Sequence, residues 1–211
     1  AAGVPRLVFT SSSGTLRNPG KDVLADESSH AKIDELPDGY HRSKLLAERA
    51  ALAANGPDIE VVVVNPTTPV GAGDVKPTPT GRIVLEFLGR RIPRYIQAWI
   101  NLVDVEDVAA GHLAAFKYGT QGERYILGGE NTTLSGTFSM LAESTGLKRW
   151  PVRIPYAVGL GLAWADDLIE GRLLRHPPYI PLEGIRAIRH PIHVECAKAH
   201  RELGYMPGPV I

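Results

Sequence analysis

The hydrophobic residues of the first third of the chain form runs that predict a strand, a helix and a second strand. Residues 6–9 are apolar or β-rich and lead into the small polar residues 10–14, as expected for a buried strand with a loop at its carboxyl end. Residues 40–54 have the composition of a strong helix. Residues 59–64 contain four successive valines, which is typical of a parallel strand covered on both faces. This order predicts a βαβ unit.

The middle of the chain continues the alternation of strands and helices. The pattern predicts a helix over about 81–89, a strand near 99–103, a helix after Asp104, a short strand over 123–127 and a helix over 134–145. Two helices show an apolar face. Its predicted members are Leu45, Leu46 and Leu52 in the first helix, and Val105, Val108, Ala109, His112, Leu113 and Phe116 in the helix after Asp104.

Past residue 150, prolines interrupt the chain and predict short helices near 156–170, 182–189 and 194–203. We therefore expect an α/β fold: a doubly wound parallel sheet with a small, mostly helical substrate cap at the C-terminal side. Residues 1–150 are expected to form mainly the sheet domain, with some cap elements at about 65–100, and residues 151–211 mostly the cap. The apolar run at 157–165 is too short to cross a bilayer, so we expect no integral membrane segment.

Composition narrows the class of protein. The 211 residues include 23 Lys or Arg and 23 Asp or Glu, so the formal net charge is zero. Proteins that bind nucleic acid or anionic membranes rely on a basic excess, so this balance argues against both. The single cysteine, Cys196, excludes an intramolecular disulfide and an all-cysteine zinc site, and we expect it to be a buried thiol.

Histidines are numerous but do not form a metal-binding pattern. None of the seven forms an H-x-H or H-E-x-x-H arrangement, and only His190 and His193 lie close together in the sequence. A metal site needs convergent ligands, which this spacing does not supply, so no metal site is predicted.

The strongest chemical signal is the pair Tyr40 and Lys44, four residues apart on the predicted helix. That spacing places both side chains on one helical face. A free tyrosine has a pKa of about 10, and a nearby ammonium lowers the pKa of a phenol by stabilising the phenolate. The pair therefore predicts a proton donor and acceptor for a carbinol or carbonyl oxygen.

The Tyr-x-x-x-Lys spacing is weak evidence by itself, because chance alone gives such a pair in roughly a quarter of sequences of this composition. The neighbouring residues strengthen the interpretation. Three serines, residues 11–13, lie at the carboxyl end of the preceding strand. Ligands of open α/β sheets bind at that edge, and a hydroxyl there can donate to the oxygen that Tyr40 protonates. Without Tyr40 and Lys44, a solvated turn would be an equally good interpretation of the serines.

Three segments together resemble a known family. Residues 6–15 (RLVFTSSSGT), 40–48 (YHRSKLLAE) and 65–71 (NPTTPVG) are similar to the extended short-chain dehydrogenase/reductases of the NAD-dependent epimerase/dehydratase superfamily. Residues 76–82, 101–112 and 123–131 narrow the resemblance to the dihydroflavonol-4-reductase-like branch, especially proteins called hopanoid-associated sugar epimerases. The resemblance covers essentially the whole chain and implies a Rossmann-type fold.

The resemblance also implies roles for individual residues. Ser12 matches the catalytic serine, Tyr40 the general acid/base, and Lys44 the residue that holds the nicotinamide ribose and tunes the tyrosine. Further contacts to an NAD or NADP cofactor are expected from Ser11, Pro66, Thr67 and Thr68, and contacts to substrate from Ser13 and Asn65. The expected activity is that of a nicotinamide-dependent oxidoreductase or epimerase acting on a carbonyl or secondary alcohol.

One feature of the family has no counterpart in the sequence. Its members begin with a strand and a Gly-rich turn whose N–H groups hold the cofactor pyrophosphate. Gly128-Gly129-Glu130 lacks that spacing, follows the helix that carries Tyr40, and instead predicts a tight turn. At about 30 residues per βαβ unit, we expect roughly 100 further residues upstream.

Two other classes of function stay open at this point. A catalytically idle member of the fold would sense nicotinamide or bind a partner, although the intact Ser/Tyr/Lys set counts against it. A membrane-surface accessory protein is disfavoured by the zero net charge. We expect a cytoplasmic enzyme with a small-molecule substrate and no nucleic-acid partner. The family resemblance also implies a possible homodimer.

Overall fold

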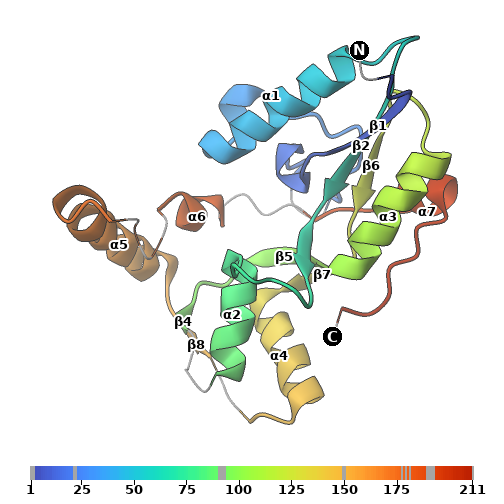
Figure 1. Cartoon of the computed structure of the whole chain (residues 1–211). Helices are drawn as coiled ribbons and strands as arrows, with labels where there is room; N and C mark the ends of the chain where they lie inside the picture. Colours follow the sequence, from blue (N-terminus) through green and yellow to red (C-terminus); the bar gives the residue numbers. More distant parts are fainter. Residues whose placement is uncertain are drawn as a thin grey trace. The chain divides into compact units, whose positions relative to one another are not determined.

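Strands and helices alternate along most of the chain (Figure 1). The computed structural model describes residues 3–20, 23–89, 94–148, 151–176, 178, 180, 182–188 and 193–210. The strands are β1 (Arg6–Thr10), β2 (Glu60–Pro66), β3 (Thr68–Val70), β4 (Arg94–Tyr95), β5 (Trp99–Asp104), β6 (Arg124–Leu127), β7 (Glu130–Thr133) and β8 (Val152–Arg153). The α-helices are α1 (Gly39–Ala53), α2 (Pro79–Leu88), α3 (Val105–Tyr118), α4 (Leu134–Thr145), α5 (Tyr156–Asp166), α6 (Leu182–Ala187) and α7 (Ala197–Leu203).

The chain divides into two compact units. The first comprises Ala1–Val75, Asn101–Asn131 and Ile192–Val210, and the second comprises mainly Lys76–Ile100 and Thr132–Pro191. This division differs from the boundary at residue 150 that the sequence suggests. The difference arises because the chain enters the second unit twice and returns to the first near its end.

A parallel sheet with the order β1-β2-β6 forms the centre of the first unit. Arg6 pairs with Glu60 at the start of β1, and Thr10 with Val64 at its end. The valines of β2, Val61–Val64, are fully buried, which confirms that this strand is covered on both faces. Figure 1 shows α1 and α3 on opposite sides of the sheet. Because all three strands run in the same direction, their carboxyl ends meet at one edge.

Helix α3 packs on the sheet through small residues. The prediction was correct for Val108, which is buried, but wrong for four other members of the face, which are exposed: Val105, Ala109, Leu113 and Phe116. Gly111 and Ala115 face the sheet instead, and a Cβ on Gly111 would lie 2.7 Å from a methyl group of Leu127. The close approach of helix and strand therefore decides which face of α3 is buried.

Helix α7 belongs to the sheet unit and not to a cap. Ala199 and Leu203 of α7 share a hydrophobic cluster with Val62 of β2 and Tyr125 of β6. Beyond the helix, the Tyr205 hydroxyl donates to the carbonyl of Gly128, at 3.1 Å. The final segment thus covers the same face of the sheet as α3.

The second unit is mostly helical, as the sequence predicts for the cap. Its core is formed by Phe87 of α2 and by Phe138 and Leu141 of α4, and the two phenyl rings stack with centroids 5.8 Å apart. Helix α5 continues into a π-helical segment, Asp167–Leu173, and α6 follows. Among the described residues, no helix is both long and apolar enough to span a membrane.

Candidate active site

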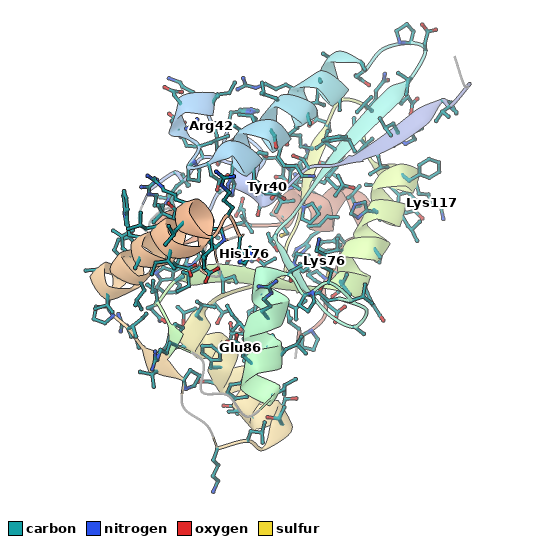
Figure 2. All side chains as sticks on the ribbon, turned by 60° about the vertical axis from the view of Figure 1, so that its left-hand side comes forward. Tyr40, Arg42, Lys76, Glu86, Lys117 and His176 are labelled. Atoms are coloured by element: carbon teal, nitrogen blue, oxygen red, sulfur yellow. The ribbon has the colours of Figure 1, made fainter. Side chains whose placement is uncertain are left out.

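Three side chains of α1 form a stripe that runs from the surface into the core. Tyr40, Lys44 and Glu48 are spaced four residues apart and therefore share one face of the helix. Tyr40 lies on the first turn (Figure 2) and is 57% exposed, Lys44 is half-buried, and Glu48 is only 2% exposed. The stripe places a phenol and an ammonium group above a buried carboxylate.

Lys44 ties this helix to the end of β1. Its Nζ donates to the backbone carbonyl of Thr10, at 3.1 Å. The Thr10 hydroxyl lies 2.8 Å from Nε2 of His112, and Nδ1 of the same ring lies 2.7 Å from the carbonyl of Val108. Both nitrogens of His112 are thus engaged in the fold. Lys44 is held at the carboxyl edge of the sheet, where the predicted site lies.

Ser12 occupies the loop directly after β1. Its backbone is extended, and its hydroxyl oxygen accepts a hydrogen bond of 3.1 Å from the N–H of Gly14, which caps the 3-10 helix Ser13–Thr15. The Ser12 carbonyl accepts from Nδ2 of Asn65, also at 3.1 Å. Within the described part of the chain, the Ser12 hydroxyl is engaged only as an acceptor. Its proton remains available for an oxygen of a bound molecule.

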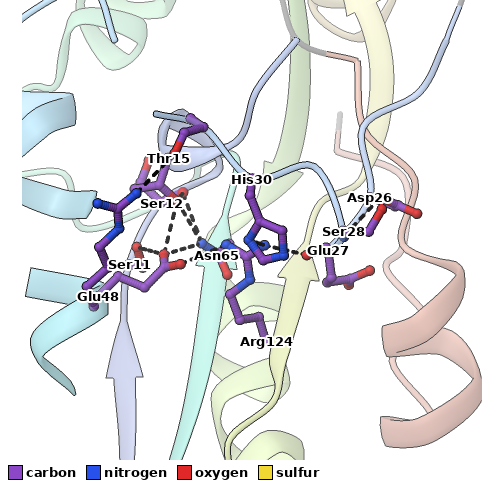
Figure 3. Close-up of polar contacts among 12 residues, drawn as sticks. Ser11, Ser12, Thr15, Asp26, Glu27, Ser28, His30, Glu48, Asn65 and Arg124 are labelled. Carbon is purple, nitrogen blue, oxygen red and sulfur yellow. Dashed lines mark hydrogen bonds and ion pairs between the residues drawn. The ribbon is translucent and has the colours of Figure 1, made fainter. Parts of the chain in front are cut away.

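Beneath this loop, the Glu48 carboxylate collects several donors (Figure 3). Oε2 accepts from the Ser11 hydroxyl at 2.5 Å and from Asn65 Nδ2 at 2.9 Å. The Thr15 hydroxyl lies 3.0 Å from the same oxygen and 2.8 Å from the Ser12 carbonyl, and its single proton serves one of these acceptors at a time. The carboxylate therefore holds residues on both sides of Ser12.

Arg124 neutralises this carboxylate from the adjacent strand β6. Its Nη1 donates to Oε1 of Glu48 at 2.8 Å, and both side chains are almost fully buried. Nη2 of Arg124 donates to the carbonyl of Glu27 and lies 3.1 Å from Nδ1 of His30. Burial raises the pKa of the Glu48 carboxyl, but the Ser11 hydrogen bond and the bond and charge of Arg124 outweigh it, so the net pKa is lowered.

Glu27 extends the network along the open edge of β6. One of its carboxylate oxygens accepts from the backbone N–H of Ile126, at 2.8 Å. Burial raises the pKa of the Glu27 carboxyl, and this hydrogen bond only partly offsets the effect. The side chain takes the place of a neighbouring strand for this N–H, so it has a structural role that the sequence does not reveal.

Most of the predicted site residues lie at one edge of the sheet, but the side chains of Ser11 and Asn65 bond to other protein groups. Ser11 and Asn65 are buried, and their side chains bond within the Glu48 network. We therefore propose that these two residues position the loop, in place of the direct cofactor and substrate contacts expected from the sequence. Ser13 is half-buried and begins the 3-10 helix.

Pro66, Thr67 and Thr68 follow one another at the same edge. Pro66 ends β2 opposite Leu127, the Thr67 N–H donates to the Leu127 carbonyl at 3.2 Å, and Thr68 begins β3. The Thr67 hydroxyl oxygen is buried and has no hydrogen-bond partner among the described residues. Buried polar atoms are rarely left unpaired, so this atom fits the expectation that a ligand contacts the segment.

Sequence reasoning missed Glu48 and Arg124. The missed signal is spacing, since Glu48 extends the series begun by Tyr40 and Lys44 by one more turn. In the predicted apolar face of α1, Leu45 is buried as expected, but Leu46 is 53% exposed. The carboxylate takes a core position because its donors compensate its burial.

Gly14 lets the Ser12 loop approach the start of α1. Asp38 caps that helix by accepting from the N–H of His41 at 2.9 Å and from its ring Nδ1 at 2.7 Å. Burial raises the pKa of Asp38, but these contacts with His41 lower it overall. The ring held in this way leaves no room beside Gly14, where a Cβ would lie 2.4 Å from Cδ2 of His41.

Gly14→Ala is therefore expected to lower the free energy of unfolding by about 1–3 kcal/mol, the usual cost of overpacking. Chemical denaturation measures the change. Gly39→Ala is the matched control, because nothing lies within 4 Å of a Cβ at that position. It should be neutral or slightly stabilising. Equal destabilisation by both substitutions would show that the His41 ring does not restrict the loop.

Two other sequence expectations concern thiol and metal chemistry. Cys196 is buried at the start of α7, and burial raises the pKa of its thiol to about 11. A thiol of this kind is a poor nucleophile at neutral pH. In the described ranges, no group of three or more metal-binding side chains comes together, while His190 lies outside those ranges.

Comparisons with known proteins extend the picture. The sequence profile of the NAD dependent epimerase/dehydratase family matches residues 1–128. A putative dihydroflavonol 4-reductase of Synechocystis sp. is 41% identical over 207 residues, which cover 96% of this chain and 60% of that protein. Sterol demethylase protein B of Methylococcus capsulatus is 31% identical over 209 residues, covering 98% and 63%.

A solved structure has the same arrangement of elements. The crystal structure of gox2253 superposes with a TM-score of 0.81 at 33% sequence identity, and the match covers 99% of this chain and 63% of that one. This likeness confirms the Rossmann-type α/β fold. The chain spans 60–63% of the length of the two curated relatives described above.

Proposed function

The chain belongs to the NAD-dependent epimerase/dehydratase family, and on this basis we propose that it carries out nicotinamide-dependent oxidoreduction at a carbonyl or secondary alcohol. The observation that carries the proposal is the placement of Tyr40 and Lys44 on one face of α1, with Lys44 bonded to the end of β1. Ser12 follows that strand in the next loop. A proton donor, a cation and a hydroxyl thus gather at the sheet edge where ligands of such folds bind.

In the proposed reaction, Tyr40 transfers the proton. Its exposed phenol gives a proton to the substrate oxygen during reduction and takes one during oxidation. The Ser12 hydroxyl donates to the same oxygen and fixes its direction, since its own oxygen is already held by the N–H of Gly14. The Lys44 ammonium lies one turn after Tyr40 on the same face of α1 and has further N–H groups for a ribose hydroxyl.

The described residues fit a nicotinamide cofactor, NAD or NADP, at this edge. Lys44 holds one end of the site. The Thr67 hydroxyl, which has no hydrogen-bond partner among the described residues, lies within the segment of Pro66, Thr67 and Thr68 that we assign to the nicotinamide end. When bound, the cofactor supplies or accepts the hydride. The protein's own part is to orient the substrate oxygen, exchange its proton and exclude water.

Two outcomes share this machinery. A reductase stops after one hydride transfer, whereas an epimerase returns the hydride to the opposite face of the same carbon. The relative at 41% identity is named a reductase, which supports a reductase for this chain, and the family name includes epimerases. We propose a small carbonyl compound as the substrate class, while homodimer formation and a cytoplasmic location stay predictions.

The test is turnover by the intact protein, with NADH or NADPH on aromatic ketones and with NAD⁺ or NADP⁺ on nucleotide sugars. A reductase consumes one reduced cofactor per alcohol formed, and an epimerase inverts a sugar carbon with no net cofactor consumption. Cofactor binding without either product would favour the alternative, a catalytically idle protein that senses nicotinamide. Absence of both binding and turnover would refute the proposal.

A further inference from the structure

Glu48 and Arg124 form an ion pair that is buried beneath the Ser12 loop, where both charges are costly to desolvate. Both side chains are at least nine-tenths buried, and no surface exposure relieves the desolvation of their charges. Buried ion pairs can often be replaced by apolar side chains without loss of stability. Stability alone therefore gives a weak reason for this pair, and its geometry suggests a different one.

Among the residues that the structure describes, the side-chain donors to Oε2 of Glu48 come from segments that carry or support Ser12. Ser11 precedes Ser12, Thr15 lies three residues after it, and Asn65 also donates to the Ser12 carbonyl. One carboxylate oxygen thus fixes the loop on both sides of the serine (Figure 3). The second oxygen is held by Arg124, which prevents the carboxylate from turning away from the loop.

The same carboxylate belongs to the helix that carries the other two site residues. Glu48 lies one turn after Lys44 and two turns after Tyr40, on the same face of α1. Because a helix is stiff over two turns, anchoring Glu48 to the loop also sets the position of Tyr40 relative to Ser12. Lys44 adds a second anchor through the carbonyl of Thr10.

We propose that Glu48 is a positioning residue, which holds the Ser12 loop against α1 so that Ser12 and Tyr40 meet the same substrate oxygen. The inference rests on the proposed function, because it assigns Glu48 a role in placing those two groups. Glu48 acts through Ser11, Thr15 and Asn65 and does not itself touch the substrate.

The role requires a carboxylate and not merely a side chain of that size. A glutamine has one acceptor oxygen and one donor amide nitrogen. If its oxygen faces Arg124, its N–H groups face the donors Asn65 and Ser11; if it is flipped, they face the guanidinium of Arg124. In either orientation a donor is left facing a donor, and the loop loses part of its support.

Glu48→Gln is expected to lower kcat of the intact protein by about 100-fold, the usual effect of a displacement near 1 Å at a reacting group. The cofactor dissociation constant should change by less than about threefold, since Lys44 and the Pro66–Thr68 segment are untouched. Ser11→Ala is the second variant. It removes one bond to the carboxylate, keeps the Glu48–Arg124 pair, and should lower kcat by about tenfold.

Val62→Ala is the control for a loss of stability alone, because Val62 is fully buried on the face of the sheet covered by α3. It should lower stability and leave kcat unchanged for the folded protein. Amide hydrogen exchange of residues 11–15 gives a readout independent of turnover, and it should speed up in Glu48→Gln but not in Val62→Ala.

The outcomes separate the two proposals. Unchanged kcat in Glu48→Gln, or exchange of residues 11–15 as slow as in the parent protein, would overturn the positioning role while the proposed function stands. A parent protein without turnover would refute the proposed function. The exchange comparison would then still decide whether Glu48 holds the loop.

Discussion

Tyr40→Phe is expected to lower kcat by about 10²- to 10⁴-fold, the range that positioned proton transfer contributes. The substitution removes only the phenolic oxygen of a side chain that is 57% exposed. No buried contact depends on that oxygen in the described part of the chain, so the fold and the cofactor affinity should remain nearly unchanged. The loss should appear in kcat, measured under saturating substrate and cofactor, and not as unfolding.

Tyr118→Phe provides a matched control for this prediction. Tyr118 ends α3, is 55% exposed, and loses the same atom in the substitution. Its variant should retain the parent kcat within about twofold. Similar activity of the Tyr40 and Tyr118 variants would contradict the assignment of Tyr40 as the acid/base, even if the protein proves to be a nicotinamide-dependent enzyme.

Arg124→Met is expected to destabilise the fold by about 3–5 kcal/mol, because it leaves the Glu48 carboxylate buried without its partner. The two side chains lie 2.8 Å apart and are almost fully buried, so water cannot solvate the charge that remains when its partner is removed. Chemical denaturation with a circular-dichroism signal measures the loss. The double variant Glu48→Gln with Arg124→Met removes both charges, keeps one acceptor oxygen for Ser11 and Asn65, and should regain part of the loss.

Glu60→Gln is the comparison for a pair of the other kind. Glu60 pairs with Arg6 at 2.6 Å, but its side chain is 46% exposed. Solvent screens such a pair, so the substitution should cost less than about 1 kcal/mol. If Arg124→Met and Glu60→Gln lowered the free energy of unfolding equally, burial of the Glu48–Arg124 pair would not make its loss more costly.

The sequence predicts the elements that depend on local pattern. The valine run of β2 is buried as expected, Asp104 caps α3, and Gly146 ends α4 in the left-handed conformation. These features follow from residue type and immediate neighbours. Hydrophobic periodicity was less successful for α1 and α3, where close packing through small residues and a buried carboxylate changed which face is covered.

The candidate site could be located from the sequence only as a set of neighbours along the chain. Tyr40, Lys44 and Ser12 follow from spacing and from the order of strand and helix. The network of Glu48 beneath the loop could not be predicted in this way. Glu48 is 37 residues from Ser11, which donates to it, and Arg124 is 76 residues from Glu48. Only the fold brings such distant groups into hydrogen-bond distance.

The origin of the hydrogen on the reacting carbon tests whether the protein carries out nicotinamide-dependent hydride transfer. Turnover by the intact protein in D₂O, analysed by mass spectrometry and NMR, distinguishes hydride transfer from proton exchange with solvent. Hydride transfer predicts that the hydrogen on that carbon of the product carries no solvent deuterium, for a reductase and an epimerase alike. Product with deuterium from D₂O at that carbon would contradict nicotinamide-dependent chemistry at this site.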